Sequence, residues 1–312
     1  MTRPSDPPQP DPRFWRALLG RSLDYRAEAA RTIRALEQDR AYTRWLLDAL
    51  DTFPVTQRIF AGDALSLLGD PRFSPPHFLS EMLPVPSGVV SIGSSDYPNE
   101  SPRHRVSVDD FALAQHPVTQ QAYRVFVEAT DHPIPNTWRR VFGRAGPADH
   151  ELNAPVVFVS ALDAEAYCRW LSAETGQAYR LPTEAEWIAA ARGYDHRRIY
   201  PWGEGSTTQR ANTWGRSAQR RLCAVGLYSA GRGPFQHDDL SGNVWEWCSS
   251  SYWPYPYRHD DGREGGFIGE PRVMHGGSWR SRPTSCRIDA RQGEPPGDSF
   301  VVTGFRIARE LE

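Results

Sequence analysis

The sulfur chemistry open to this chain depends on four cysteines, above all on Cys286 near the C-terminal end. Cys286 lies between two glycine-containing runs, Gly276-Gly-Ser-Trp279 and Gly304-Phe-Arg306. Two thiolates suit the soft ion Cu(I), whereas a single thiolate does not hold it in a linear geometry. No Cys-x-x-Cys motif occurs, and four cysteines are too sparse in 312 residues for a disulfide scaffold. The cysteines therefore predict neither a disulfide framework nor a complete copper site.

Two further patterns and one absence bear on catalysis. His237-Asp-Asp239 and His259-Asp-Asp261 each contain the His-x-Asp half of an iron-binding facial triad. That spacing is common by chance, and both runs lie in turn-rich polar segments, so we favour ordinary loops over an iron site. All 36 basic residues are arginine. The absence of lysine excludes Schiff-base chemistry, pyridoxal phosphate anchoring and the Walker lysine of P-loop proteins.

Charge and hydropathy exclude two classes of partner. The formal net charge is −2 and no basic block occurs, which argues against nucleic acid. No apolar run approaches the roughly 18 residues that a membrane span needs. The start, Met1-Thr-Arg-Pro-Ser-Asp-Pro-Pro-Gln-Pro10, lacks the apolar segment of a secretory signal. We therefore expect a cytoplasmic protein without a nucleic-acid or membrane partner.

The first 84 residues predict a tail followed by helices. Residues 1–20 begin with a run rich in Pro and Asp and are expected to be a disordered tail, and residues 21–84 a helical region. Within that region, Ser22 to Leu50 has the period of one or two amphipathic helices, and Thr56 to Leu68 predicts another, capped by Thr56 and ended by Gly69. So short a unit cannot form a solenoid alone. It is either a packing appendage or a docking element for a partner.

Residues 85–312 predict a second, larger unit. Residues 89–93 and 105–108 alternate like strands, and residues 119–129 and 161–175 have the apolar period of helices. Thr183 and Glu186 form a capping box for a helix that ends before Gly193. Residues 194–312 show almost no regular period and are rich in aromatic, Gly and Pro residues. Side-chain packing, or metal ions, must hold that half together.

Eight motifs along this larger unit occur in the order typical of one known family. They are Val89-Val-Ser-Ile-Gly-Ser94, His116-Pro-Val-Thr119, Arg180-Leu-Pro-Thr-Glu-Ala-Glu-Trp187, Tyr200-Pro-Trp-Gly203, Ala211-Asn-Thr213, Ser241-Gly-Asn-Val-Trp-Glu-Trp247, Gly276-Gly-Ser-Trp279 and Gly304-Phe-Arg306. The chain thus resembles the formylglycine-generating enzyme, or sulfatase-modifying factor, family over about residues 85–310. The resemblance implies an α+β, C-type-lectin-like domain with little regular secondary structure, in which Trp245, Trp247 and Trp279 belong to the core.

The resemblance also implies an activity that this chain is poorly equipped for. Oxidases of the family use two thiolates, copper and O2 to convert a substrate cysteine into formylglycine. The matching positions here are Ser281 and Cys286, with Ser278 and Trp245 as further family positions. A hydroxyl is a hard donor, so copper affinity should fall steeply. We therefore expect Cys286 to be a small apolar filler, and nothing in the family pattern gives Cys248 the missing role.

Calcium is the cofactor that the resemblance favours. Family members bind Ca²⁺ around the Gly-Asn-x-Trp-Glu-Trp turn, and the matching ligands are Asp239, Glu246 and the carbonyls of Gly242 and Val244. Oxygen ligands from a turn suit this hard cation. A second family site would begin at Asn212, but no acidic residue occurs between Arg216 and Gln236. The alternative for Glu246 is that it binds backbone amides.

Two functions from different classes remain open. One is a copper-dependent oxidoreductase acting on a substrate cysteine, which the loss of a thiol at Ser281 disfavours. The other is a non-catalytic module that binds a protein or peptide ligand, because the segment between the two conserved-looking runs differs from the catalytic members. It resembles the variable proteins of diversity-generating retroelements, which display residues on the same fold. The matching displayed positions are Arg280, Ser281, Arg282, Ser285, Asp298, Ser299, Phe300, Val301 and Val302.

Overall fold

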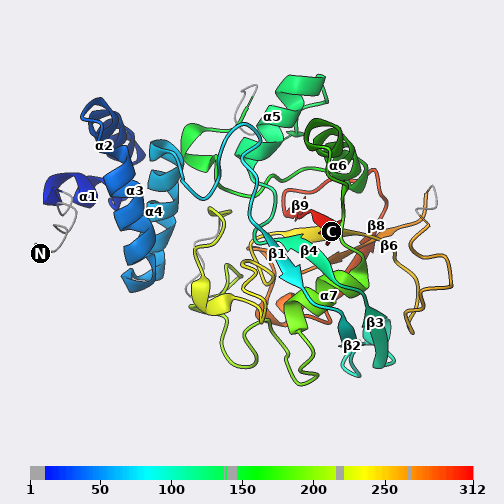
Figure 1. Ribbon diagram of the computed structural model, residues 1–312. Coiled ribbons are helices and arrows are strands. Elements are labelled where there is room, and N and C mark those ends of the chain that lie inside the picture. Colours follow the sequence, from blue (N-terminus) through cyan, green and yellow to red (C-terminus); the bar gives the residue numbers. More distant parts are fainter. Residues whose placement is uncertain (1–10, 137, 139–145, 216–220, 266–268, 312) are drawn as a thin grey trace, which may run out of the picture.

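The computed structural model describes residues 11–311, apart from residue 137 and residues 139–145, 216–220 and 266–268. Helices at the N-terminal end pack against one side of a larger α+β unit, in which three small sheets are flanked by helices (Figure 1). Among the described residues, no helix is long and apolar enough to cross a membrane.

Four helices form the N-terminal region: α1 (Pro12–Leu18), α2 (Leu23–Ala35), α3 (Asp39–Ala49) and α4 (Val55–Leu68). The predicted helical stretches are confirmed, and Gly69 ends α4 with a φ of +93°. Thr56 lies inside α4, where Pro54 occupies the capping position instead. The predicted disordered tail is wrong for residues 12–18, because α1 forms there and Leu18 is fully buried against the other helices. Residues 1–10 lie outside the described residues.

The N-terminal helices do not stand apart from the rest of the chain. Their apolar core is continuous with Cys223, Ala224, Leu227 and Tyr228 of the larger unit. The Asp63 carboxylate of α4 binds two guanidinium groups, that of Arg26 at 3.1 Å and that of Arg221 at 2.8 Å. The helical region is therefore a packed appendage in this structure. Whether it also docks a partner remains a prediction.

Two sheets form one half of the larger unit. Strands β1 (Met82–Val85), β4 (Phe111–Ala114), β10 (Ala308–Glu310) and β5 (Tyr179–Arg180) pair in that order, all antiparallel. Strands β2 (Gly88–Ile92) and β3 (His104–Val108) form a separate hairpin, as predicted. Since β1 pairs with β4, the larger unit begins before the predicted boundary at residue 85.

The third sheet corrects the expectation of almost no regular structure after residue 194. It has the order β8 (Arg291–Glu294), β7 (Arg272–His275), β6 (Trp245–Ser251) and β9 (Thr303–Phe305). Strand β6 runs parallel to β9, whereas β7 runs antiparallel to its neighbours β6 and β8. Every residue of β7 is buried, and so is all of β6 except Ser249. Strands buried on both faces lack the period of two that identifies a half-exposed strand, so the sequence pattern could not show them.

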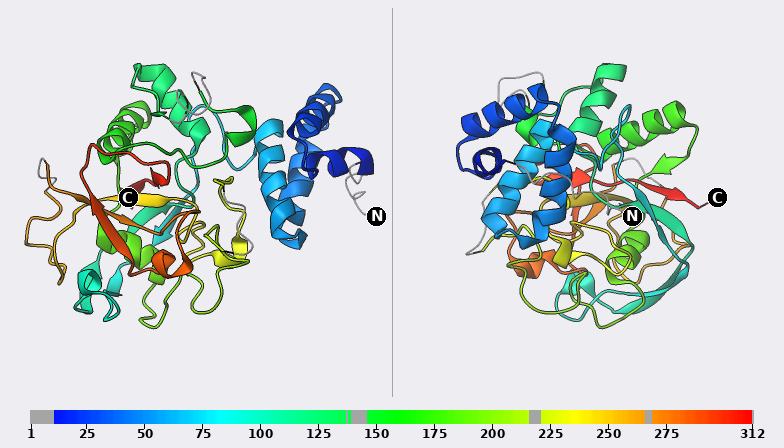
Figure 2. Two further views of the ribbon diagram at one scale, coloured as in Figure 1. Left: turned by 180° about the vertical axis from the view of Figure 1, so that it is seen from behind. Right: turned by 60° about the vertical axis from the view of Figure 1, so that its left-hand side comes forward.

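Helices cover the sheets on two sides (Figure 2). Helices α5 (Gln120–Thr130) and α6 (Ala161–Thr175) lie on one side, and α7 (Glu184–Arg192) lies on the other. The predicted capping box of α7 is present, with Thr183 and Glu186 each accepting a backbone N–H from the other. Short 3-10 helices occur at Leu50–Thr52, Pro98–Glu100, Asp149–Glu151, Ser229–Gly231 and Pro283–Cys286.

Candidate functional site

The parallel pairing of β6 with β9 brings distant segments together at the C-terminal surface. Trp245 pairs with Thr303, and the Trp245 N–H donates to the Val302 carbonyl at 2.8 Å. From the other side, the Phe158 N–H donates to the Phe300 carbonyl at 3.0 Å. Three chain segments therefore meet around the loop that precedes β9.

The Gly-Gly-Ser-Trp turn forms the opposite wall. Gly276 and Gly277 have φ values of +93° and +70°, which residues with a Cβ rarely adopt. A Cβ at Gly277 would also collide with the Cys286 sulfur beneath the turn. The Trp279 N–H donates to the Asn243 carbonyl at 3.1 Å, which fixes the turn to the segment before β6.

A pocket of about 420 Å³ lies between these walls. Six of the nine predicted displayed positions line it, whereas Arg282, Ser285 and Asp298 do not. Its lining consists of Phe158, Trp245, Ser278, Arg280, Ser281, Ser299, Phe300, Val301 and Val302. The structure thus places most of the predicted binding residues around one concavity.

The pocket has an apolar body, a few hydroxyls and one charge. Five lining side chains are aromatic or aliphatic and three are serines, so Arg280 is the single charged residue among them. The Arg280 guanidinium lies 5.5 Å from the centre of the Trp279 ring, a cation–π arrangement that limits its freedom. Such a lining, mostly apolar with a few polar groups that fix orientation, is typical of small-ligand sites.

Ser281 holds the turn instead of supplying a reactive group. Its Oγ accepts the Ser278 N–H at 3.0 Å and lies 3.0 Å from the Ser278 Oγ. The Ser278 Oγ in turn accepts the Arg280 N–H at 3.2 Å. These bonds are those of a local serine turn, and a neutral hydroxyl engaged in this way is a poor copper ligand.

Cys286 lies beneath the pocket and not in it. Its side chain is fully buried, and burial raises the pKa of the thiol to about 12. The thiolate, which is the nucleophile and the metal ligand, is therefore scarce at neutral pH. Cys248, in the middle of β6, is also fully buried with a raised pKa. Both cysteines are placed as apolar fillers.

One predicted calcium ligand, Glu246, is held by other side chains. Both oxygens of the Glu246 carboxylate accept from the Arg306 guanidinium at 2.6 Å, and one also accepts from the Trp187 indole at 2.7 Å. A cation there would have to displace a buried guanidinium. The Glu246 carboxylate is therefore bound by two side chains and not by the backbone amides of the alternative. Calcium binding at this turn stays a prediction.

Asp239 is held by the backbone of a neighbouring loop. Its carboxylate accepts the Gly226 N–H at 2.7 Å, and burial, with a smaller contribution from the neighbouring Asp238, raises its pKa to about 7. At the second family position, the Asn212 amide donates to the Asn243 side chain at 3.1 Å. Within the described part of the chain, no group of three or more His, Cys, Asp or Glu side chains could hold a metal ion.

The two His-x-Asp patterns are separate structural features. His237 is fully buried beside the Leu113 carbonyl at 3.2 Å, and burial lowers its pKa to about 3. His259 lies 2.8 Å from the Ser107 carbonyl. Neither belongs to a group of three or more His, Cys, Asp or Glu side chains among the described residues.

Two residues of the site region were missed at the level of sequence. Phe158 lines the pocket with an unusual φ of +59°, and no local pattern marks a phenylalanine for that conformation. Arg306 looked like part of a family motif only. In the structure it is fully buried, and it also donates to the Ala114, Gln115 and Asp238 carbonyls. The apolar residues next to Arg306 in the sequence do not indicate which distant groups it will bind.

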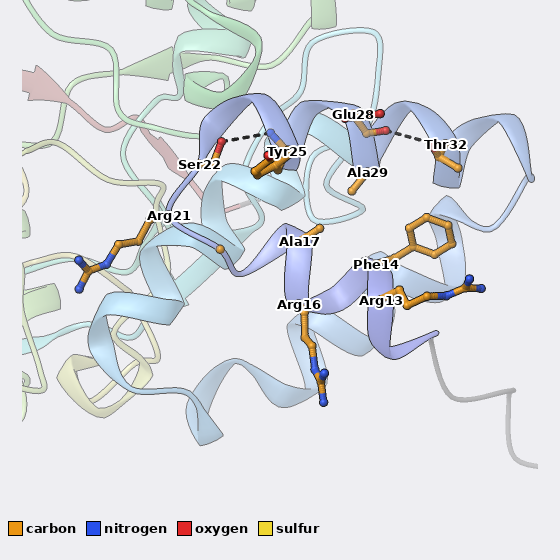
Figure 3. Close-up of a pocket in the computed structure, with 11 residues that line it drawn as sticks. Arg13, Phe14, Arg16, Ala17, Arg21, Ser22, Tyr25, Glu28, Ala29 and Thr32 are labelled. Atoms are coloured by element: carbon orange, nitrogen blue, oxygen red, sulfur yellow. Dashed lines mark hydrogen bonds between the residues drawn. The ribbon is translucent and has the colours of Figure 1, made fainter.

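Two other hollows are less suited to a ligand. The one between α1 and α2 measures about 370 Å³, and its Arg13, Arg16 and Arg21 side chains point away from one another (Figure 3). The other, about 760 Å³, lies between β3 and α7. Two of its carboxylates are already bound within the chain, Glu186 by Arg180 at 2.7 Å and Glu264 by Ser250 at 2.6 Å. The pocket at the C-terminal surface is therefore the candidate site.

Fold and site together define an α+β protein in which loops around a small parallel strand pair enclose a pocket. The family described as sulfatase-modifying factor enzyme 1-like domain matches residues 71–311. The chain belongs to this family, which confirms the resemblance and the predicted fold class.

The chain has similar sequence identity to a relative named as an enzyme and to a relative named as inactive. The mouse inactive C-alpha-formylglycine-generating enzyme 2 is 30% identical over 298 residues, covering 78% of this chain and 91% of the relative. The mouse formylglycine-generating enzyme is 28% identical over 307 residues, covering 80% and 79%. Family membership alone therefore does not decide between the two functions.

Solved structures agree on the fold. PvdO from Pseudomonas aeruginosa is similar with a TM-score of 0.63 and 28% identity, over 76% of this chain and 100% of PvdO. Variable protein 1 of Treponema denticola is similar with a TM-score of 0.58 and 21% identity, over 74% of this chain and 95% of that protein. At that identity the second likeness shows the fold alone.

Proposed function

We propose that this chain is a non-catalytic binding module that holds a protein or peptide ligand at its C-terminal surface. The observation that carries the proposal is the pocket between the Gly-Gly-Ser-Trp turn and the loop before β9. Six of the nine positions singled out as displayed residues line it. All nine are at least partly exposed. A cytoplasmic location belongs to the same proposal.

The state of the sulfur and hydroxyl groups supports binding over oxidation. Cys286 is fully buried, and burial raises its pKa to about 12. Ser281 is engaged by the Ser278 backbone. Copper binding by two thiolates needs two accessible sulfur anions. Here one position is a hydroxyl and the other is a buried thiol. The residues do not fit the copper ion, and the proposed function uses none.

The proposed binding function is tested with a displayed library of random peptides selected against the immobilised protein. We expect selected peptides whose affinity, measured by calorimetry, falls at least tenfold in Val301→Glu, which places a charge in the apolar lining. Val89→Glu is the matched control, because it makes the same substitution at an exposed valine that does not line the pocket. Equal loss in both variants, or in neither, would contradict the assignment of the pocket.

The oxidase alternative has its own test. The chain is incubated with Cu(I), O2 and a Cys-x-Pro-x-Arg peptide, and the peptide is analysed by mass spectrometry for loss of the thiol. We expect no conversion above a copper-only control. Clear turnover would overturn the proposal. A near-copy of the 3′ end of the gene, differing at adenines, would support a display role further.

A further inference from the structure

We infer that the pocket accepts an apolar carboxylic acid, either a free acid or the C-terminal residue of a peptide. This inference rests on the proposed binding function and names the chemistry of its ligand. It follows from the distribution of charge and apolar surface over the nine lining residues.

The apolar part of the ligand is set by the body of the pocket. Phe158, Trp245 and Phe300 supply aromatic surface from three separate segments, and Val301 and Val302 supply aliphatic surface. A volume of about 420 Å³ is large enough for an aromatic ring or a branched aliphatic side chain. Burying that group removes apolar area from water both on the ligand and on the half-buried loop before β9.

The charged part of the ligand is set by Arg280. It is the single charged residue of the lining, and it forms no ion pair with any residue in the described ranges. No carboxylate lines the pocket to neutralise it. A guanidinium presents parallel N–H groups that match a carboxylate, and the Arg280 guanidinium lies 5.5 Å from the centre of the Trp279 ring. A cationic ligand would instead meet an uncompensated positive charge.

One serine hydroxyl of the lining can add a hydrogen bond to the carboxylate. Ser281 and Ser278 are committed to each other and to the turn. The Ser299 hydroxyl, on the opposite wall, has no hydrogen-bond partner among the described residues and can donate to the second carboxylate oxygen. One guanidinium and one hydroxyl suit a single carboxylate better than a phosphate, which carries more charge and more acceptor oxygens.

The test uses four probes in two matched pairs. They are 3-phenylpropanoate and its amide, and acetyl-Gly-Gly-Phe as the free acid and as the C-terminal amide. Dissociation constants are measured by ligand-observed NMR with the full chain. We expect each acid to bind about fivefold more tightly than its amide, which is the upper range for an exposed ion pair. Preference for the peptide pair over the small pair identifies a peptide C-terminus as the source.

Variants link that preference to the pocket. In Arg280→Gln the acids should bind about fivefold more weakly, and the difference between acid and amide should vanish. Arg105→Gln, which changes an exposed arginine of β3 outside the lining, should keep both affinities. Equal binding of acids and amides, no effect of Arg280→Gln, or no binding of any probe would overturn the inference. The proposed binding function would survive each of these results if library-selected peptides still depended on Val301.

Discussion

The ion pair between Glu246 and Arg306 makes the sharpest prediction, because it occupies the place where calcium was expected. Both side chains are fully buried, and the Arg306 Nε and Nη2 atoms each lie 2.6 Å from a Glu246 oxygen. Removing one charge of such a pair leaves the other buried without compensation, which costs about 3–5 kcal/mol. We therefore expect Glu246→Gln to lower the melting midpoint by on the order of 10 °C.

The assay is thermal unfolding followed by calorimetry, run for Glu246→Gln, Arg306→Met and the double variant. The two residues touch, so the double variant should lose about 1–3 kcal/mol less than the sum of the single variants. Trp187→Phe removes the indole N–H donor to Glu246 and also shortens a fully buried ring that stacks on His275. It should therefore cost about 1–3 kcal/mol for the lost donor and more for the lost packing.

The dependence of the melting midpoint on Ca²⁺ can refute this reasoning. A ligand that binds the folded state raises stability by mass action. If Glu246 binds Arg306 as described, the wild-type midpoint should be the same in excess EDTA and in millimolar Ca²⁺. A midpoint that rises with Ca²⁺ in the wild type but not in Glu246→Gln, together with additive losses in the cycle, would show that the carboxylate serves the metal.

Three further predictions concern other buried groups. Iodoacetamide at pH 8 should leave Cys286 unmodified in the folded chain and alkylate it in denaturant, because burial raises its pKa to about 12; rapid labelling of folded protein would contradict this. Asp239→Asn should raise the free energy of unfolding by a few kcal/mol over the wild type at pH 8, and should leave it unchanged near pH 4. The pKa of Asp239 is about 7 in the folded chain and about 3.9 in the unfolded chain. Between about pH 4 and 7 the unfolded chain therefore loses this proton first, and the wild type loses stability that the Asn variant keeps. A stability difference that does not change with pH would refute this prediction. Asp63→Ala should cost about 3 kcal/mol by leaving Arg26 buried beside Arg221, with faster amide exchange in α2 and α4 as the readout and unchanged exchange as the contrary result.

The local elements were predictable wherever a short stretch of chain carries the whole signal. The capping box of Thr183 and Glu186, the end of α4 at Gly69 and the hairpin of β2 with β3 all depend on neighbours within a few residues. Such signals survive in any tertiary context because they satisfy backbone groups locally. The location of six of the nine singled-out positions around one pocket could be anticipated for a related reason, since two recognisable motifs bracket them.

Strand partners and the partners of buried charges were not predictable in this way. Strand β6 pairs with β9, which lies more than fifty residues further along the chain, and both are buried, so their side chains show no alternation. Glu246 was assigned to calcium because its motif suggested oxygen ligation. Whether a buried carboxylate binds a metal or a guanidinium depends on which cation the fold brings to it, and here that is Arg306.

The sequence by itself determined the family, the local helices and the absence of a second thiol at Ser281, because these depend on residue identity and short-range order. Only the tertiary structure decided that Phe158, Arg280 and Val301 line one pocket, that Cys286 lies beneath it, and that α1 is an ordered part of the fold. Burial and long-range pairing are properties of the assembled core. They set the pKa of a thiol, the partner of a charge and the shape of a site, and no segment carries them alone.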